Sequence, residues 1–221
     1  QVTVLEQNPY PGGKLSSLQV GDFRFDAGPS LCTLPDKLHA VFREAGRTPE
    51  DYLRFLPLPE ACRYYWQDGT QFRALQDPAA FSQEAAQVFG VPATRVRRHL
   101  RRSQHLWDAT HRVFLGQSLH KLRTYLSLDT LRTFLGTPPW ALVQSLHGHN
   151  RGLGHPKLAQ YFDRFATYNG SDPYQAPAIM SLIPHLEHGI AAVFPEGAMI
   201  TITTSYHRLA QELGVRFRFG E

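Results

Sequence analysis

Val2-Thr3-Val4-Leu5-Glu6 is an apolar run that ends in an acid, and Pro11-Gly12-Gly13-Lys14 follows shortly after it. The run predicts a β-strand whose tip carries the carboxylate. In a dinucleotide-binding βαβ unit, the second strand ends in an acid that hydrogen-bonds the ribose of the nucleotide. The stretch therefore predicts an α/β fold that contains a partial Rossmann-like nucleotide-binding domain.

The glycine-rich turn of such a unit is missing from the printed sequence. In a βαβ unit, a first strand, this turn and a helix come before the acid, which follows the glycines by about 20 residues. Here the acid is already at position 6. We therefore expect the chain to be an internal segment that enters the cofactor site partway through, and we expect it to be inactive by itself.

The composition is that of a globular protein. Of 221 residues, 42% are hydrophobic, which is enough for a real core. The net charge of +4 is too small to indicate a nucleic-acid partner. The two cysteines lack metal-ligand spacing and predict cytosolic thiols, and no apolar stretch reaches the roughly 18 residues of a membrane span. These features predict a cytoplasmic protein without a transmembrane helix.

The remaining pattern alternates between strands and helices. Apolar spacing and turn residues predict strands at 2–6, 23–26, 63–66, 71–75 and 215–219, and helices at 35–45, 156–166 and 206–213. Asp68-Gly69 between two β-prone runs indicates a hairpin, and residues 77–144 show helical spacing. We expect a partial nucleotide-binding domain at 1–60, an α+β substrate-binding and helical region at 61–193, and a return to the first domain at 194–221.

Three features near the first strand fit a nucleotide. Glu6 can accept hydrogen bonds from ribose hydroxyls, although a strand-end acid is also common without a ligand. Gly12 and Gly13 allow backbone amides to approach an anionic or planar group, and Lys14 can neutralise a phosphate. A plain surface turn would use the same Pro-Gly-Gly sequence.

Several motifs carry a family resemblance. Leu5-Glu6-Gln7-Asn8 with Pro11-Gly12-Gly13-Lys14, followed by Phe25-Asp26-Ala27-Gly28-Pro29-Ser30, resembles the N-terminal region of bacterial carotenoid desaturases, flavoproteins of the phytoene dehydrogenase type. Residues 164–178 most resemble the 1-hydroxycarotenoid 3,4-desaturase branch, and residues 183–188 and 194–197 extend the similarity. The resemblance implies FAD as cofactor and desaturation of an acyclic carotenoid, with the hydroxycarotenoid 3,4 bond favoured and phytoene as the alternative.

The resemblance also implies roles for individual residues. It makes Glu6 the ADP-ribose ligand, Gly12, Gly13 and Lys14 the contacts of the pyrophosphate or flavin, and Ala27, Gly28 and Pro29 the loop near the isoalloxazine. One departure is Ala198, which stands where the family usually has a second glycine, so close backbone approach to the flavin is not expected there. A second is the run 200–204, which is richer in β-branched residues than a helix start prefers.

The implied reaction removes a hydride and a proton from neighbouring carbons, and a flavin rather than a side chain accepts the hydride. The protein then has to hold a polyene in an apolar tunnel and exclude water. The residues we expect to line such a tunnel are Tyr168, Tyr174, Ile179, Met180, Leu182 and Ile183. Ordinary core packing would explain each of them equally well, and no residue stands out as a catalytic base.

A carotenoid dissolves in the bilayer, so we expect peripheral membrane association. Arginines surround Val96, Leu100 and Trp107 between positions 95 and 112, as in a basic amphipathic helix at a membrane, although a solvated helix face has the same pattern. His147, His149 and His155 lack a carboxylate at ligand spacing, so no metal is expected. A flavin amine oxidase and a non-catalytic membrane-surface module are the alternatives from other classes.

Overall fold

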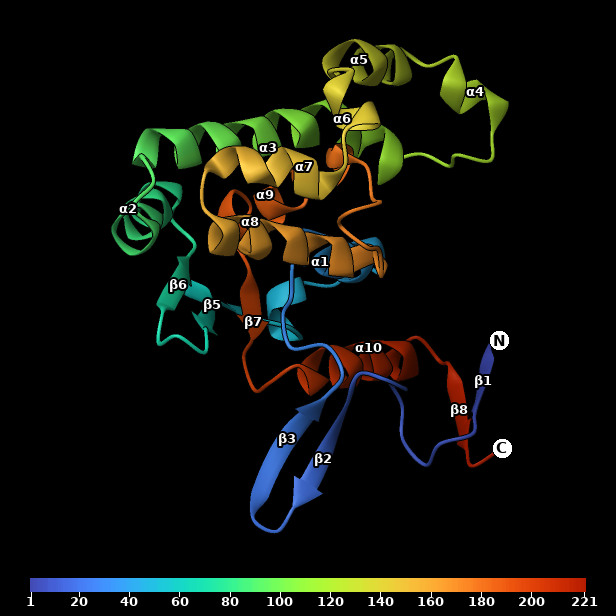
Figure 1. Cartoon of the computed structure of the whole chain (residues 1–221). Coiled ribbons are helices and arrows are strands. Elements are labelled where there is room, and N and C mark those ends of the chain that lie inside the picture. Colours follow the sequence, from blue (N-terminus) through green and yellow to red (C-terminus); the bar gives the residue numbers. More distant parts are fainter. The chain divides into compact units, whose positions relative to one another are not determined.

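The computed structural model describes all residues from 1 to 221, and these form two compact units (Figure 1). Unit 1 comprises residues 1–58 and 192–221, and unit 2 comprises residues 59–191. The division into domains at 1–60, 61–193 and 194–221 stays a prediction, because a compact unit is not by itself an independently folding domain.

Unit 1 contains three two-stranded sheets. Strand β1 (Thr3–Glu6) pairs in parallel with β8 (Arg216–Phe219), and β2 (Ser16–Val20) pairs antiparallel with β3 (Phe23–Ala27). Strand β4 (Phe55–Pro57) pairs antiparallel with β7 (Val193–Pro195). Two of the three sheets therefore join the first part of the chain to the last.

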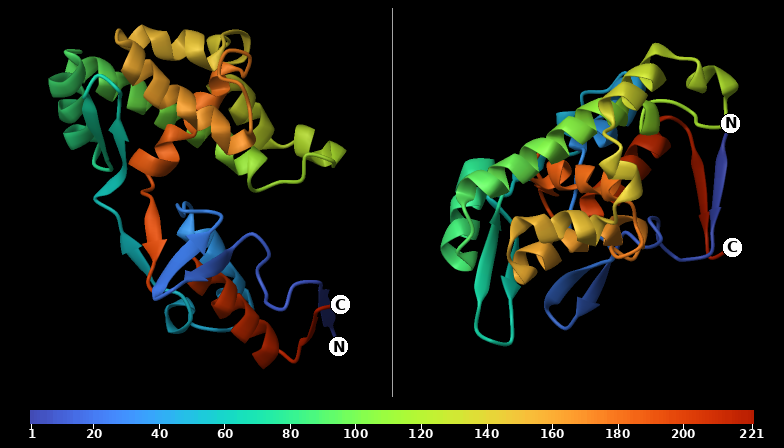
Figure 2. Two further views of the ribbon diagram at one scale, coloured as in Figure 1. Left: turned by 60° about the horizontal axis from the view of Figure 1, so that its bottom comes forward. Right: turned by 45° about the horizontal axis from the view of Figure 1, so that its top comes forward.

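The core of unit 1 lies between helix α1 (Pro35–Glu44) and helix α10 (Ile200–Glu212), with a 3-10 turn η1 (Pro49–Asp51) beside them. Its buried residues are Cys32, Phe42, Leu53, Met199, Ile202 and Leu209. In Figure 2 the blue β2–β3 hairpin lies near the red helix α10, and the two are in contact. Helix α10 is thus central to the packing of unit 1.

The expectation that the β-branched run 200–204 disfavours a helix start was wrong. Helix α10 begins at Ile200, six residues before the predicted start at 206. Ile202 is buried in the core, and the Thr203 hydroxyl donates to the Leu15 carbonyl at 2.9 Å. Ser205 donates to the Tyr52 carbonyl at 2.6 Å. These tertiary contacts outweigh a propensity difference of a few tenths of a kcal/mol per residue.

Unit 2 combines one hairpin with a helical assembly. Strands β5 (Glu60–Tyr65) and β6 (Gln71–Leu75) pair antiparallel, which confirms the predicted hairpin. The helices are α2 (Pro78–Phe89), α3 (Ala93–Phe114), α4 (Leu122–Tyr125), α5 (Leu128–Gly136), α6 (Trp140–Val143), α7 (Leu146–Asn150), α8 (Pro156–Asp163) and α9 (Pro184–His188). Short 3-10 segments η2 (Arg151–Leu153), η3 (Arg164–Asn169) and η4 (Ala178–Leu182) connect them.

Buried aromatic rings form the centre of unit 2. Phe72 of β6 lies against Phe81 of α2 with ring centroids 5.3 Å apart, and Tyr161 of α8 lies 5.5 Å from Phe72. All three rings are fully buried or nearly so. The hairpin and the helices therefore share one apolar core, which is what a two-stranded sheet requires because it is marginally stable alone.

The apolar face of α3 belongs to this core. Val96, Leu100, Leu106 and Trp107 are all buried, and the helix packs on α2, α5, α9 and η4. The suggestion that these residues dock residues 95–112 on a membrane is therefore wrong, because their side chains already face protein. None of the helices combines the length and hydrophobicity needed to cross a bilayer.

The turn before α10 contains a strained residue. Gly197 has φ of +88° and Ala198 has φ of +93°, so both occupy the region that favours glycine. The Ala198 amide donates to the Pro195 carbonyl at 3.1 Å, and the Met199 amide donates to Asp26 Oδ2 at 3.1 Å. These bonds hold Ala198 in a conformation that its Cβ disfavours.

Replacing Ala198 with glycine should therefore stabilise unit 1. The substitution relieves about 1–2 kcal/mol of backbone strain in the folded state. Glycine also gives the unfolded chain more conformational entropy, which opposes folding by about 0.4–1 kcal/mol. We therefore expect the free energy of unfolding to rise by about 0.5–1 kcal/mol. Urea unfolding of both proteins measures this difference in the free energy of unfolding. As a control, Ala40→Gly in the middle of α1 should lose about 1 kcal/mol. A loss of stability in Ala198→Gly would contradict the strain argument.

Candidate functional site

Glu6 lies at the carboxyl end of the parallel β1–β8 pair. Its backbone carbonyl accepts hydrogen bonds from the Gly220 amide at 2.8 Å and the Glu221 amide at 3.2 Å. Its side-chain Oε1 accepts from the Asn8 amide at 2.8 Å and from Asn8 Nδ2 at 2.9 Å. The other carboxylate oxygen has no hydrogen bond within the chain, and it lies at the edge where parallel sheets bind ligands.

The Pro-Gly-Gly-Lys turn uses its two glycines differently. At Gly12, φ is +105°, and a Cβ would lie 2.5 Å from both the Leu15 carbonyl oxygen and Thr203 Cγ2. Gly12 is therefore required for packing of the turn on α10. Gly13 has φ of +54° and no heavy atom within 4 Å of its Cβ position. Gly13 and the exposed Lys14 thus form the open part of the turn.

The second predicted cofactor segment touches the first. Strand β3 ends at Ala27, which pairs with Ser16 directly after the glycine turn. Gly28 has φ of +106°, and a Cβ there would lie 2.1 Å from the Lys14 carbonyl oxygen. Any other residue at 28 would push the two loops apart. Ala27 is half-buried, whereas Gly28 and Pro29 are exposed beside Lys14.

Two residues of the β2–β3 hairpin fix the turn before α10. Asp26 Oδ2 accepts a hydrogen bond from the Met199 amide at 3.1 Å, and Arg24 Nη2 donates to the Gly197 carbonyl at 2.9 Å. Asp26 Oδ1 is buried without a partner. The sequence reasoning missed both roles, because each contact joins residues 173 positions apart and no local spacing indicates it.

These residues fit a nucleotide with a ribose and a pyrophosphate. Glu6 offers a free carboxylate oxygen to a hydroxyl group, Gly13 leaves its backbone open to close approach, and Lys14 supplies an accessible positive charge. The structure brings Gly12, Gly13 and Lys14 together with Ala27, Gly28 and Pro29, and it places Glu6 at the end of β1. Their contacts with a cofactor stay predictions.

The residues expected to line a substrate tunnel lie in unit 2, and they differ from one another in burial and in their contacts. The Tyr168 hydroxyl donates to Glu187 Oε1 at 2.7 Å, and burial with the nearby Glu187 charge raises the pKa of Tyr168. Tyr174 is exposed and lies against the His147 ring at 4.2 Å. Ile179, Met180 and Leu182 are half-buried, and Ile183 is buried. Their contact with a substrate stays a prediction.

A buried ion pair holds the segment around Tyr168. Glu187 of α9 is fully buried and accepts a hydrogen bond from Arg164 Nη2 at 2.7 Å. Next to it, the Tyr161 hydroxyl lies 2.7 Å from His188 Nε2, and burial lowers the pKa of His188 to about 4. Arg164, Glu187 and His188 lie within the motifs that carry the family resemblance, but no local pattern indicates their pairing. Removing one charge of such a pair typically costs about 3–5 kcal/mol.

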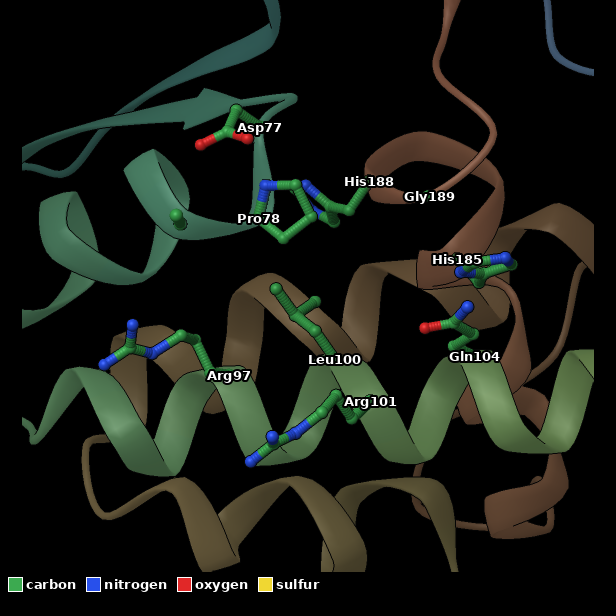
Figure 3. A pocket seen from close by; sticks show the side chains of 10 residues that line it. Asp77, Pro78, Arg97, Leu100, Arg101, Gln104, His185, His188 and Gly189 are labelled. Atoms are coloured by element: carbon green, nitrogen blue, oxygen red, sulfur yellow. The ribbon is translucent and has the colours of Figure 1, made fainter.

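Figure 3 shows a cavity of unit 2 with a volume of about 480 Å³. It lies between the start of α2, the helix α3 and the helix α9. Its lining includes Asp77, Arg97, Arg101, Gln104, His185 and His188. Pro78, Ala79 and Leu100 also line this cavity, so its wall combines apolar side chains with charged and polar ones.

The whole chain, residues 1–221, matches the family of flavin containing amine oxidoreductases. It is 42% identical to 1-hydroxycarotenoid 3,4-desaturase of Flavobacterium sp. (strain P99-3) over 99% of this chain and 45% of that protein. It is 32% identical to hydroxyneurosporene desaturase of Rhodobacter capsulatus, over 100% of this chain and 44% of that protein. It is 29% identical to zeta-carotene-forming phytoene desaturase of Myxococcus xanthus, over 99% of this chain and 42% of that protein.

Solved structures show the same fold at low identity. The PF1083 protein from Pyrococcus furiosus matches with a TM-score of 0.58 and 12% identity, over 99% of this chain and 45% of that one. Rab GDI from Plasmodium falciparum matches with a TM-score of 0.51 and 16% identity, over 100% of this chain and 52% of that one. The chain spans a little under half the length of the curated relatives named above. By its full-length family match, the chain belongs to the flavin containing amine oxidoreductases, with FAD as cofactor.

Proposed function

We propose that this protein is a FAD-dependent carotenoid desaturase that acts on the 3,4 bond of an acyclic hydroxylated carotenoid. The observation that carries the proposal is the 42% identity to 1-hydroxycarotenoid 3,4-desaturase over 99% of the chain. Identity to the zeta-carotene-forming phytoene desaturase is 29%, which favours the hydroxycarotenoid over phytoene as substrate.

The residues of unit 1 support this proposal through the cofactor. Bound FAD supplies the acceptor for the hydride that leaves the polyene. In our proposal, Glu6 binds the ribose, Gly13 and Lys14 bind the pyrophosphate, and the loop 27–29 lies along the flavin. Strands β1 and β8 are then neighbouring strands of a Rossmann-type sheet, with the cofactor at their carboxyl ends.

Peripheral membrane association is part of the proposal, because the substrate dissolves in lipid. Its support is a set of exposed apolar residues in and next to helices α4–α6, which we call the α4–α6 surface. Leu126, Phe134 and Val143 are 88%, 76% and 85% exposed there, a degree of exposure unusual for such residues. Lys121, Arg123 and Arg132 accompany them and suit an anionic interface. The remaining exposed apolar residues of this surface are Leu122, Tyr125, Leu128, Leu131, Leu135 and Leu142.

The desaturase proposal is tested by expressing the complete reading frame that encodes this chain in a bacterial host that accumulates a 1-hydroxycarotenoid. We expect a flavin absorbance spectrum in the purified protein and a pigment with two hydrogen atoms fewer by mass spectrometry. A parallel host that accumulates phytoene distinguishes the alternative substrate. Bound flavin with both pigments unchanged would overturn the proposal. Amine-dependent flavin reduction would then favour an amine oxidase, and vesicle binding without flavin would favour a non-catalytic module.

The role of Glu6 is tested by Glu6→Gln in the same protein. Loss of a charge-assisted hydrogen bond costs about 1.5–3 kcal/mol, so we expect FAD to bind at least tenfold more weakly. Titration of the flavin-free protein with FAD measures the affinity. Glu44→Gln is the matched control, because Glu44 is an exposed acid on α1 of the same unit. Equal FAD affinity in both variants would exclude Glu6 as the ribose ligand.

Membrane docking is tested by Leu126→Ser combined with Leu128→Ser and Phe134→Ser. Each side chain contributes apolar area to the α4–α6 surface, so the triple variant should partition at least tenfold less to vesicles that contain anionic lipid. Cosedimentation measures the partition. A control triple variant changes three exposed apolar residues of unit 1, namely Val41→Ser, Leu56→Ser and Leu213→Ser. Similar losses in both triple variants would argue against a specific docking surface.

A further inference from the structure

A second cavity of unit 2 lies on another side of α3 and is lined by a stripe of arginines. Arg95, Arg98 and Arg102 follow one another at spacings of three and four residues, which places them on one helix face together with His99. The opposite wall comes from His149 of α7 and from Gly152 and Leu153 of η2. The cavity has a volume of about 140 Å³. At roughly 30 Å³ per water, this is room for about four or five waters or one small ion.

The first arginine of the stripe is fixed against the opposite wall. Arg95 Nη1 donates to the Leu153 carbonyl at 3.3 Å. The same nitrogen lies 2.4 Å from the position that a Cβ at Gly154 would occupy, so the guanidinium fills the space beside this glycine. The helix α3 and the segment η2 are thus joined across the cavity. A site whose walls are held together by its own residues is partly preorganised.

Two buried imidazoles add unpartnered polar atoms. His99 and His149 are 6% and 9% exposed, and Nε2 of each is buried without a hydrogen-bond partner. Their rings stack with centroids 4.9 Å apart, and Trp140 stacks on His149 at 4.5 Å. A buried polar atom without a partner is costly and is uncommon in native proteins. Both histidines line the cavity, so a ligand there would lie beside the two unpartnered rings.

The charges around the cavity have one sign. Burial and the nearby Arg102 charge lower the pKa of His149 to about 4, so this imidazole is neutral near pH 7. The cavity lining contains three arginines and no carboxylate. The ion pairs of the chain involve other residues, so these three charges have no acidic partner. An anion is the ligand that satisfies the arginines, and the tautomer with the proton on Nε2 would let each neutral imidazole donate to it.

We propose that this cavity is a binding site for an oxyanion of the size of phosphate, held by Arg95, Arg98 and Arg102 and by Nε2 of His99 and His149. Planar guanidinium groups match the oxygen geometry of phosphate and bind it in a bidentate manner. The same chemistry is offered by a soluble phosphate and by the phosphate headgroup of a lipid. The site is separate from the residues assigned to FAD, all of which belong to unit 1.

The other stripe of α3 provides a matched control. Arg97 and Arg101 come from the same helix and are exposed like Arg98 and Arg102, but they line the cavity of Figure 3 instead. That cavity also contains the Asp77 carboxylate. The double variants Arg98→Gln/Arg102→Gln and Arg97→Gln/Arg101→Gln therefore remove the same charge from the same helix and differ in the cavity that they affect.

The first arm of the test is isothermal titration of the protein expressed from the complete reading frame with inorganic phosphate at constant ionic strength. We expect saturable binding that weakens at least tenfold in Arg98→Gln/Arg102→Gln and less than twofold in Arg97→Gln/Arg101→Gln. His149→Phe keeps a ring for stacking on Trp140 and removes Nε2, so it should weaken binding at least threefold. Thermal unfolding in phosphate-free buffer checks that each variant is folded.

The second arm measures cosedimentation with phosphatidylcholine vesicles that contain either phosphatidic acid or phosphatidylserine. Binding that prefers phosphatidic acid and depends on Arg98 and Arg102 would identify a lipid headgroup as the source. Binding of phosphate without this preference would identify a soluble ligand, and either result supports the site. The proposal is overturned if neither arm shows binding, or if both double variants lose binding equally. Because inorganic phosphate needs neither FAD nor a carotenoid, the outcome is independent of the desaturase proposal.

Discussion

The docking of residues 192–221 onto residues 1–58 is the constraint on which the proposed cofactor site depends. Strand β8 pairs with β1 up to Glu6, which lies opposite Phe219. Helix α10 supports the glycine turn through the Thr203–Leu15 hydrogen bond. In the sequence, residues 59–191, which form unit 2, separate these two segments. Loop-closure entropy grows only with the logarithm of loop length, so a long insertion costs unit 1 little. A large inserted unit is therefore compatible with the docking of the two segments of unit 1.

The glycines of the proposed cofactor site combine close packing with open space. Gly12 and Gly28 are required by contacts within the chain, with Thr203 and with the Lys14 carbonyl, and both have φ above +100°. Only Gly13 faces open space. Gly12 and Gly28 hold the turn in one conformation. This lowers the conformational entropy lost when an anionic group binds the backbone of Gly13. A glycine-rich motif therefore mixes structural and ligand-facing positions that the sequence alone does not separate.

Local pattern predicted those parts of the fold whose partners are close in sequence. Strand β1, helix α1 and the hairpin of β5 and β6 were found because periodicity and the Asp68-Gly69 turn act over a few residues. Strands β4 and β7 are three residues long and pair across the whole of unit 2, so no local signal exists for them. The early start of α10 and the roles of Arg24 and Asp26 also depend on contacts between residues far apart in the sequence, so local pattern did not predict them. For α3, amphipathicity predicted a helix but could not distinguish protein from membrane as the partner of its apolar face.

The charge pattern of α3 has an energetic consequence. Five arginines lie between positions 95 and 102, and like charges three and four residues apart destabilise a helix by a few tenths of a kcal/mol per pair. None of these five arginines forms an ion pair, in contrast to Arg164, which pairs with Glu187 at 2.7 Å. Burial of Val96, Leu100 and Leu106 offsets the repulsion within α3, since each buried side chain of this kind contributes about 1.5–3 kcal/mol. An anion that binds only the folded chain would reduce the same repulsion, so occupancy of the arginine site and the stability of unit 2 are thermodynamically linked.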